Sequence, residues 1–201
     1  MDVELLKSIK EYRTAYLKKV TLPAEVIEAA EALISNKYYN SKFDYTNKTY
    51  YEILDLKDKN GDTALMLAAW NDHKDIVNLL IKAGADLNLK NNFGDTALIW
   101  ATTYNQKDIA ELLINAGANI NLGNNIGRTA LMWASINKRI SMVEFLINAG
   151  AKIDLKDING DTALILASFN KDIIELLIKA GADVNLKNNY GNTANINRFS
   201  M

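Results

Sequence analysis

A short phrase that returns every 33 residues restricts the fold of this chain more than any other feature of its sequence. The phrase Gly-Asp-Thr-Ala-Leu begins at Gly61 and returns at Gly94, Gly127 and Gly160, with Arg in place of Asp in the third copy. A second phrase, Ala-Gly-Ala, keeps the same period over three copies and returns after only 31 residues in the fourth. Such a period predicts a solenoid, in which each unit buries its apolar side against its neighbours.

Each unit carries the signals for two helices joined by a polar turn. Thr63 stands at the N-cap position of a short apolar helix over 64–69, and the polar residues Asn71 and Asp72 end this helix. The next segment spaces its apolar residues as i, i+3, i+4 and i+7, which predicts an amphipathic helix. The residues predicted to form its buried side are Ile76, Leu79, Leu80 and Ala83. In the second unit, truncating a core residue such as Leu112 to alanine is expected to cost about 2–5 kcal/mol.

These phrases resemble the ankyrin repeat family, whose units open on Gly-x-Thr-Pro-Leu-His and end on Gly-Ala-Asp-hydrophobic-Asn. Here the first unit reads Gly-Asp-Thr-Ala-Leu-Met and Gly-Ala-Asp-Leu-Asn. The resemblance implies an all-α ankyrin-repeat solenoid with β-hairpin loops. It divides 57–201 into full repeats at 58–90, 91–123, 124–156 and 157–187, followed by a partial repeat at 188–201.

The chain departs from the family pattern at positions that affect every helix pair. Alanine replaces the family's proline, and methionine or isoleucine replaces its histidine, as at Met66 and Ile99. Apolar contacts between repeats are therefore expected to replace the hydrogen bonds of that histidine. The family's glycine between the two helices is also missing, and the residues that stand near its place are Asp72, Asn105 and Lys138.

Residues 1–56 lack the repeat phrase and are predicted to form a helical capping segment. Apolar residues from Leu5 to Tyr16 share one helical face, and Pro23 marks the start of a second helix. A tyrosine-rich loop over 37–51 follows. We interpret this loop either as an aromatic contact loop or as a hairpin whose rings pack on the first repeat.

The resemblance implies a binding function, because ankyrin proteins usually bind other proteins on a concave face built from hairpin tips and first helices. Matching those places to this sequence gives a candidate partner-binding set: Asp62, Trp70, Asn71, Phe93, Asp95, Tyr104, Ile126, Arg128, Ile136, Asp161, Phe169 and Tyr190. The large apolar members predict an exposed stripe that anchors a partner. The alternative is that they pack on neighbouring repeats.

Two further groups of side chains are interpreted from their positions in the repeat. The aspartates of the candidate set form an acidic row interrupted by Arg128, which either meets basic groups of a partner or is simply solvated. Trp100 and Trp133 occupy the place held by Leu67 in the first repeat, and we interpret both as core residues.

The composition argues against several other functions. A net charge of −1 does not favour nucleic-acid binding, which needs an excess of Lys and Arg. The chain has no cysteine and a single histidine, His73, so it offers few of the usual ligands for zinc and few catalytic triads. The segment 58–61 resembles half of a calcium loop but lacks the first and twelfth ligands. We therefore expect no enzyme, no cofactor and no metal site.

The ends and the apolar runs of the chain suggest a location. No secretory signal pattern opens the sequence, and no apolar run approaches the roughly 20 residues that cross a bilayer. These features predict a cytoplasmic protein (or one delivered into a host cell) without a membrane partner. Its predicted partner is another protein, and the chain itself is expected to be a monomer or a weak homodimer. The alternative function is self-association through an incomplete C-terminal repeat, which is expected to leave three residues poorly covered: Ile173, Leu176 and Leu177.

Overall fold

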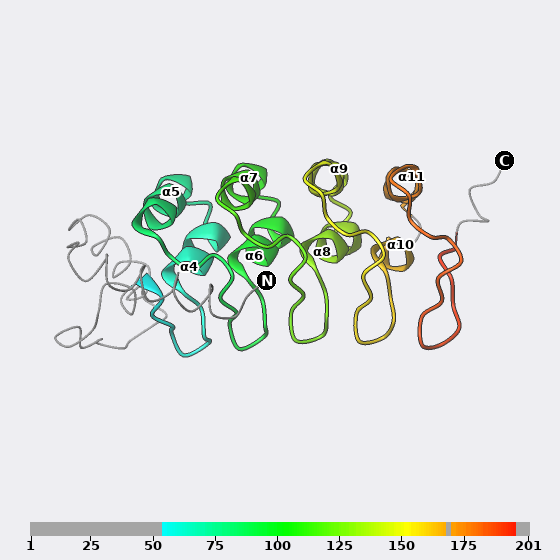
Figure 1. Cartoon of the computed structure of the whole chain (residues 1–201), viewed down its shortest axis with the longest axis horizontal. Helices are drawn as coiled ribbons and strands as arrows, with labels where there is room; N and C mark the ends of the chain where they lie inside the picture. Colours follow the sequence, from blue (N-terminus) through cyan, green and yellow to red (C-terminus); the bar gives the residue numbers. More distant parts are fainter. Residues whose placement is uncertain (1–53, 168–169, 196–201) are drawn as a thin grey trace, which may run out of the picture.

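The computed structural model describes residues 54–167 and 170–195, which form an elongated stack of helix pairs (Figure 1). The first helices of the pairs are α4 (Ala64–Trp70), α6 (Ala97–Thr103), α8 (Ala130–Ile136) and α10 (Ala163–Leu166). The second helices are α5 (Lys74–Ala83), α7 (Lys107–Asn115), α9 (Ile140–Asn148) and α11 (Lys171–Lys179). The two sets of helices form two rows, and the loops between pairs project beyond the row of first helices.

The predicted all-α solenoid is confirmed, and its hairpin loops consist of turns. Within the described ranges the one β-bridge joins Lys57 and Thr63, and no extended strand forms. Among the same residues, no helix is long and apolar enough to cross a membrane. The predicted capping segment up to residue 53, including the tyrosine-rich loop at 37–51, lies outside the described residues.

The first helices form the central row because they are short, apolar and capped at a fixed place. In the second repeat Oγ1 of Thr96 accepts a hydrogen bond from the backbone N–H of Ile99 at 3.3 Å. The equivalent threonine caps the first helix in each of the other three repeats. Residues 64–69 of α4 are all buried. Contacts run from α4 to α6, from α6 to α8 and from α8 to α10, so this row is the continuous core of the stack.

Methionine at the place of the family's histidine keeps part of its hydrogen bonding. The sulfur of Met66 accepts from the backbone N–H of Thr63 at 3.5 Å, and Met132 makes the same contact with Thr129. The expectation that apolar contact alone replaces the histidine is therefore wrong for these two repeats, because a thioether is a weak acceptor.

The buried side of the second helices is shifted from the predicted one. Val77 and Leu80 are fully buried, whereas Ile76, Leu79 and Ala83 are half-buried. The same shift makes Leu113 the core residue of α7, while Leu112 is half-buried. The reason is that each second helix packs on the first helix of its own repeat and also meets neighbouring second helices, so its apolar side is wider than one face.

The last helix pair is better covered than the sequence suggested. Ile173 and Leu177 are fully buried, so the expectation that they are poorly covered is wrong. Leu176 is half-buried, like Leu112 and Phe145 at the same place in earlier repeats. Ala194 of the partial fifth repeat is itself buried.

Candidate functional site

One polar side chain opens each loop and fixes its shape. In the second repeat Oδ1 of Asn91 accepts from the backbone N–H groups of Phe93 and Asp95, both at 2.9 Å. The residues that do the same in the other loops are Asp58, Asn124, Asp157 and Asn188. The loop backbone is therefore held from within, and in the second and fifth loops the third residue is strongly exposed: Phe93 is 65% exposed and Tyr190 74%.

The same side chain also links each loop to the loop before it. Nδ2 of Asn91 donates to Oδ1 of Asp62 at 2.7 Å. The equivalent bonds join Asn124 to Asp95 at 2.9 Å and Asn188 to Asp161 at 2.7 Å. The third interface reverses the chemistry, because there Nε of Arg128 donates to Oδ2 of Asp157 at 3.2 Å. We call these four contacts the interloop pairs.

The interloop pairs change the interpretation of the acidic row. Asp62 is only 3% exposed, and Asp95 and Asp161 are half-buried. The aspartates of the row are therefore not simply solvated, because each pairs with the next loop, and Asp62 leaves almost no accessible surface for a partner. Arg128 is likewise engaged, with a side chain that is 23% exposed.

Burial also perturbs the ionisation of two of these aspartates. Loss of hydration raises the pKa of Asp62 above its ordinary value, the bond from Asn91 opposes this, and the charges of Asp58 and Asp95 add to the rise. Burial likewise raises the pKa of Asp95, and the bond from Asn124 opposes it. The loops of the first two repeats thus concentrate negative charge that is incompletely hydrated.

Three aromatic side chains of the first two repeats form one cluster, which we call the aromatic patch. Trp70 ends α4, Trp100 lies within α6, and Tyr104 caps α6. The rings of Trp100 and Tyr104 stack with centroids 5.8 Å apart and planes at 9°, because an i, i+4 spacing places them on one face of the helix. Trp70 lies against both rings, at 5.3 Å from Trp100 and 6.1 Å from Tyr104. Trp70 is 37% exposed and Tyr104 46%, so the patch reaches the surface.

Trp100 was interpreted as a core residue, and that interpretation is only partly correct. Its ring packs on the core but is half-buried, whereas Leu67 at the same place in the first repeat is buried. Within the described part of the chain, the indole N–H groups of Trp100 and Trp133 are buried without a hydrogen-bond partner. The surface of both side chains is therefore carbon. The sequence did contain a signal for this exposure, because the Trp100 ring is larger than the leucine that holds the same place in the first repeat.

Trp133 has the same place in the third repeat but a different neighbour. The guanidinium carbon of Arg128 lies 5.5 Å from the centroid of the Trp133 ring. This distance is typical of a cation–π contact. Arg128 also pairs with Asp157, which fixes the position of its guanidinium. The third repeat therefore covers its tryptophan with an arginine of the same repeat.

The remaining candidates are divided between exposed, partly covered and undescribed positions. Phe93, Ile126 and Tyr190 are exposed at the loop tips, and Ile136 is half-buried at the end of α8. Asn71 is exposed, although its amide donates to the backbone carbonyl of Leu67 at 2.8 Å. Ile158, which the repeat pattern did not place among the candidates, is 62% exposed at the second position of its loop. Phe169 lies outside the described residues.

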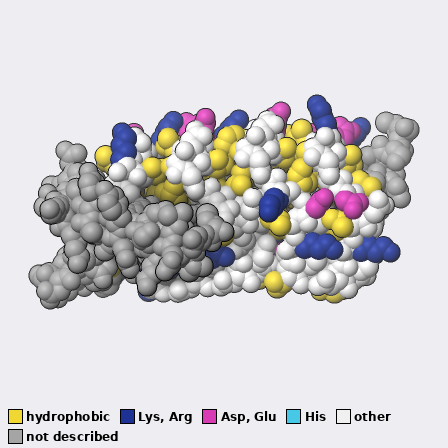
Figure 2. All heavy atoms as spheres, viewed as in Figure 1, with side chains coloured by type: hydrophobic (Ala, Val, Ile, Leu, Met, Phe, Trp, Pro, Cys, Tyr) yellow, Lys and Arg dark blue, Asp and Glu magenta, His cyan; other side chains and the backbone are white. Residues whose placement is uncertain are grey.

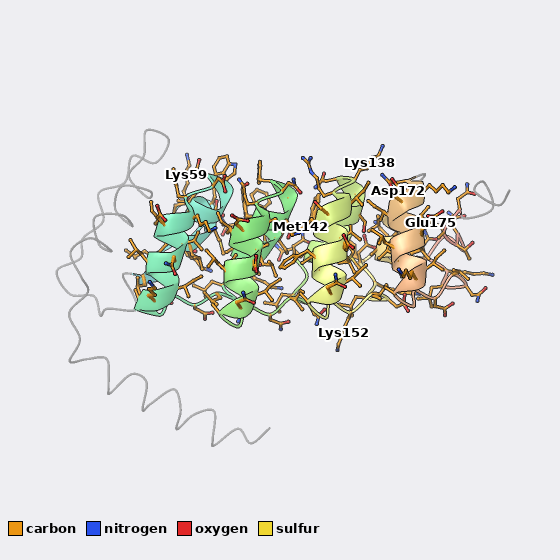
Figure 3. The ribbon with its side chains drawn as sticks, turned by 90° about the horizontal axis from the view of Figure 1, so that it is seen from above. Lys59, Lys138, Met142, Lys152, Asp172 and Glu175 are labelled. Carbon is orange, nitrogen blue, oxygen red and sulfur yellow. The ribbon has the colours of Figure 1, made fainter. Side chains whose placement is uncertain are left out.

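The aromatic patch lies at one long edge of the stack. Figure 3 shows Lys59 and Lys138 along the same edge, with Lys152 on the opposite one. Tyr104 directly precedes Asn105, which holds in the second repeat the turn position of Lys138. The patch therefore belongs to the edge of Lys59 and Lys138. The view in Figure 2 shows apolar, basic and acidic side chains intermixed on the described surface that it presents.

Comparison with known protein families gives matches along the whole stack. A family model for three ankyrin repeats matches residues 84–157, and a single-repeat model matches residues 60–92 and 159–189. Together these matches cover more than half of the chain. A search of curated proteins found no matching relative.

Proposed function

The chain belongs to the ankyrin repeat family, whose repeats are general protein–protein interaction modules and typically non-catalytic, and from this premise we propose that it binds a partner protein through the aromatic patch and the exposed loop tips. The observation that carries the proposal is the contact of three large rings at a surface. Exposed aromatic groups of this kind mark interaction sites and dominate the energy of interfaces.

The loop tips add apolar anchors on a prearranged backbone. The exposed tip residues are Phe93, Ile126, Ile158 and Tyr190. Because an Asn or Asp inside each loop holds two backbone N–H groups, ordering these loops should cost a partner little entropy. The loops and the patch together form the binding face of this proposal.

Self-association, the alternative function, lacks the support that motivated it, because Ile173 and Leu177 are buried. The outer side of the second helices also offers less, since its exposed large apolar residues, Ile140 and Ile178, are each 39% exposed and stand apart on α9 and α11. The experiment must therefore be able to detect self-association. Ile140, which is exposed on α9 outside the proposed binding face, is the site of the control substitution.

The test compares capture of partners by two surface variants. The double variant Phe93→Ser/Tyr104→Ala removes two exposed rings, and Ile140→Ser removes an exposed side chain elsewhere. Proteins that cross-link to the wild type in its native extract should also cross-link to Ile140→Ser, and they should no longer cross-link to the double variant. Circular dichroism and thermal unfolding should show that both variants are folded.

Two results would overturn the proposal. One is equal capture by the wild type and the double variant. The other is a stable homodimer, measured by light scattering, that the double variant dissolves, because the binding face would then serve self-association.

A further inference from the structure

The second and third repeats each have a tryptophan at the same place, and they differ in the residue that stands five positions before it. Position 128 precedes Trp133 by five residues, and its guanidinium covers that ring. The equivalent residue in the second repeat is Asp95, five residues before Trp100. The second repeat therefore has the ring and lacks the internal cation.

The Asp95 carboxylate has an oxygen available for a partner. Asn124 donates to Oδ1 of Asp95, and no other residue in the described ranges donates to the second oxygen. Asp62 lies close enough to feel the charge of Asp95, and both groups are incompletely hydrated. A cation that approaches here gains from two negative charges that water screens poorly.

Tyr104 and Trp70 contact the Trp100 ring, whereas Asp95 lies before the N-terminal end of α6. Tyr104 stacks on the ring from the C-terminal end of the helix. The place corresponding to that of Arg128 is thus on the loop side of Trp100, next to Asp95.

We propose that an arginine of the partner protein occupies this place, with its guanidinium over the Trp100 ring and paired with the Asp95 carboxylate. Arginine fits better than lysine because a planar guanidinium stacks on a ring and pairs with a carboxylate at the same time. Arg128 shows, one repeat further along, that a guanidinium can lie over the equivalent ring and pair with a carboxylate at the same time, although its carboxylate, Asp157, belongs to the next loop. This inference rests on the proposed function, since it names the chemistry that the partner brings to the binding face.

A titration of the full chain with N-acetyl-arginine amide tests the contact directly. The three tryptophans, Trp70, Trp100 and Trp133, give three indole N–H resonances that substitution by phenylalanine assigns. Arginine amide at millimolar concentrations should shift the Trp100 resonance saturably, and the Trp133 resonance less, because Arg128 already covers that ring. N-acetyl-citrulline amide has the same shape without the charge and should give no saturable shift.

Two variants keep the test independent of folding. Asp95→Arg/Asn124→Asp builds into the second repeat the pair that Arg128 and Asp157 form in the next one, and it should abolish the shift at Trp100. Asp95→Asn removes the charge, keeps an acceptor for Asn124 and should reduce the shift. Equal shifts from arginine and citrulline amides, or an unchanged response of either variant, would overturn the inference.

The captured partner separates this inference from the proposed function. The partner should bind Asp95→Arg/Asn124→Asp roughly tenfold more weakly than the wild type, as expected for the loss of a stacked and paired cation. If it binds that variant as tightly as the wild type but loses affinity for Phe93→Ser/Tyr104→Ala, the binding face stands and the arginine contact is refuted. If neither variant loses the partner, both proposals fail.

Discussion

Three residues between the paired helices adopt the left-handed backbone conformation without being glycine. Their φ angles are 60° at Asp72, 62° at Asn105 and 56° at Lys138. Asparagine and aspartate tolerate this region because their short polar side chains bond locally, but lysine does not have that advantage. The stack therefore stores backbone strain at Lys138 in particular.

We expect Lys138→Gly to stabilise the chain by about 0.5–1 kcal/mol, since glycine removes the strain and loses part of the gain to its own flexibility. Lys138 is exposed, so its side chain contributes little packing. Urea unfolding measures the effect, and Asn105→Gly is the matched control, with a smaller gain. A destabilised Lys138→Gly would show that the lysine side chain matters more than its backbone.

A second residue-level prediction concerns the pH dependence of stability at Asp62. Burial raises the pKa of Asp62 in the folded chain, so the folded state binds that proton more tightly than the unfolded state does. Ionised Asp62 therefore costs stability at neutral pH, and the cost vanishes below the pKa of the unfolded chain. Relative to the wild type, Asp62→Asn should gain stability as the pH rises from about 3 to about 7.

Asp108 provides a control of opposite sign for this prediction. The hydrogen bond and charge of Lys74 lower the pKa of Asp108, so its ionised form adds stability that is lost as the pH falls. Asp108→Asn should therefore lose stability relative to the wild type over the same rise in pH. Urea midpoints at several pH values measure both differences, and parallel curves for the two variants would contradict the assignment.

Burial of single residues was the least predictable property at this scale. Asp62 and Arg128 looked like surface charges because a single sequence gives no view of the next loop, which supplies Asn91 and Asp157 as partners. Trp100 looked like a core residue because its repeat position is apolar, yet its ring extends beyond the space that Leu67 fills. The exposure of Phe93 and Tyr190 at the loop tips is confirmed, because their place in the turn follows from the local repeat phrase.

The elements were better predicted than the residues, because their signals are local. The threonine N-caps and the helix-ending Gly84 depend on a few adjacent residues, and the structure has them where the sequence placed them. The interloop pairs were missed although their signal was present. Wherever a loop carries Asp at its fifth position, the next loop opens on Asn, and where it carries Arg128 the next opens on Asp157.

That matching predicts a strong coupling between the third and fourth repeats. Asp157→Asn keeps the acceptor that shapes the loop but directs an amide donor at Arg128, so we expect a loss of about 1–3 kcal/mol. Arg128→Asp should lose a similar amount because two carboxylates then meet. The double variant Arg128→Asp/Asp157→Asn recreates the Asp–Asn pair of the other interfaces and should recover most of both losses.

Urea unfolding of the two single variants and the double variant forms a complete cycle. A coupling of at least about 1 kcal/mol is expected for side chains that share one buried contact. Losses that simply add would mean that the two residues act independently. The predicted coupling between the third and fourth repeats through this interloop pair would then be wrong.

At the scale of the described stack, the main helix packing between repeats joins adjacent repeats. Each first helix packs on the first helix of the next repeat, and α5 packs on α7 as α9 does on α11. In such a stack, an inner repeat supports neighbours on both sides and an end repeat supports one. The position of a damaged repeat should therefore decide how far the damage spreads.

Leu113 and Leu177 allow this to be tested, because both side chains are fully buried and hold the same place in α7 and α11. Leucine to alanine should cost about 2–5 kcal/mol locally at either site. In Leu113→Ala the loss should spread in both directions, so amide exchange accelerates in α5 and α9 as well as in α7. In Leu177→Ala fraying should stay at the C-terminal end, with fast exchange in α11 and unchanged protection in α5. If the two variants gave the same exchange pattern along the chain, the stack would unfold as a single cooperative unit, and damage at the C-terminal end would reach the aromatic patch in the first two repeats.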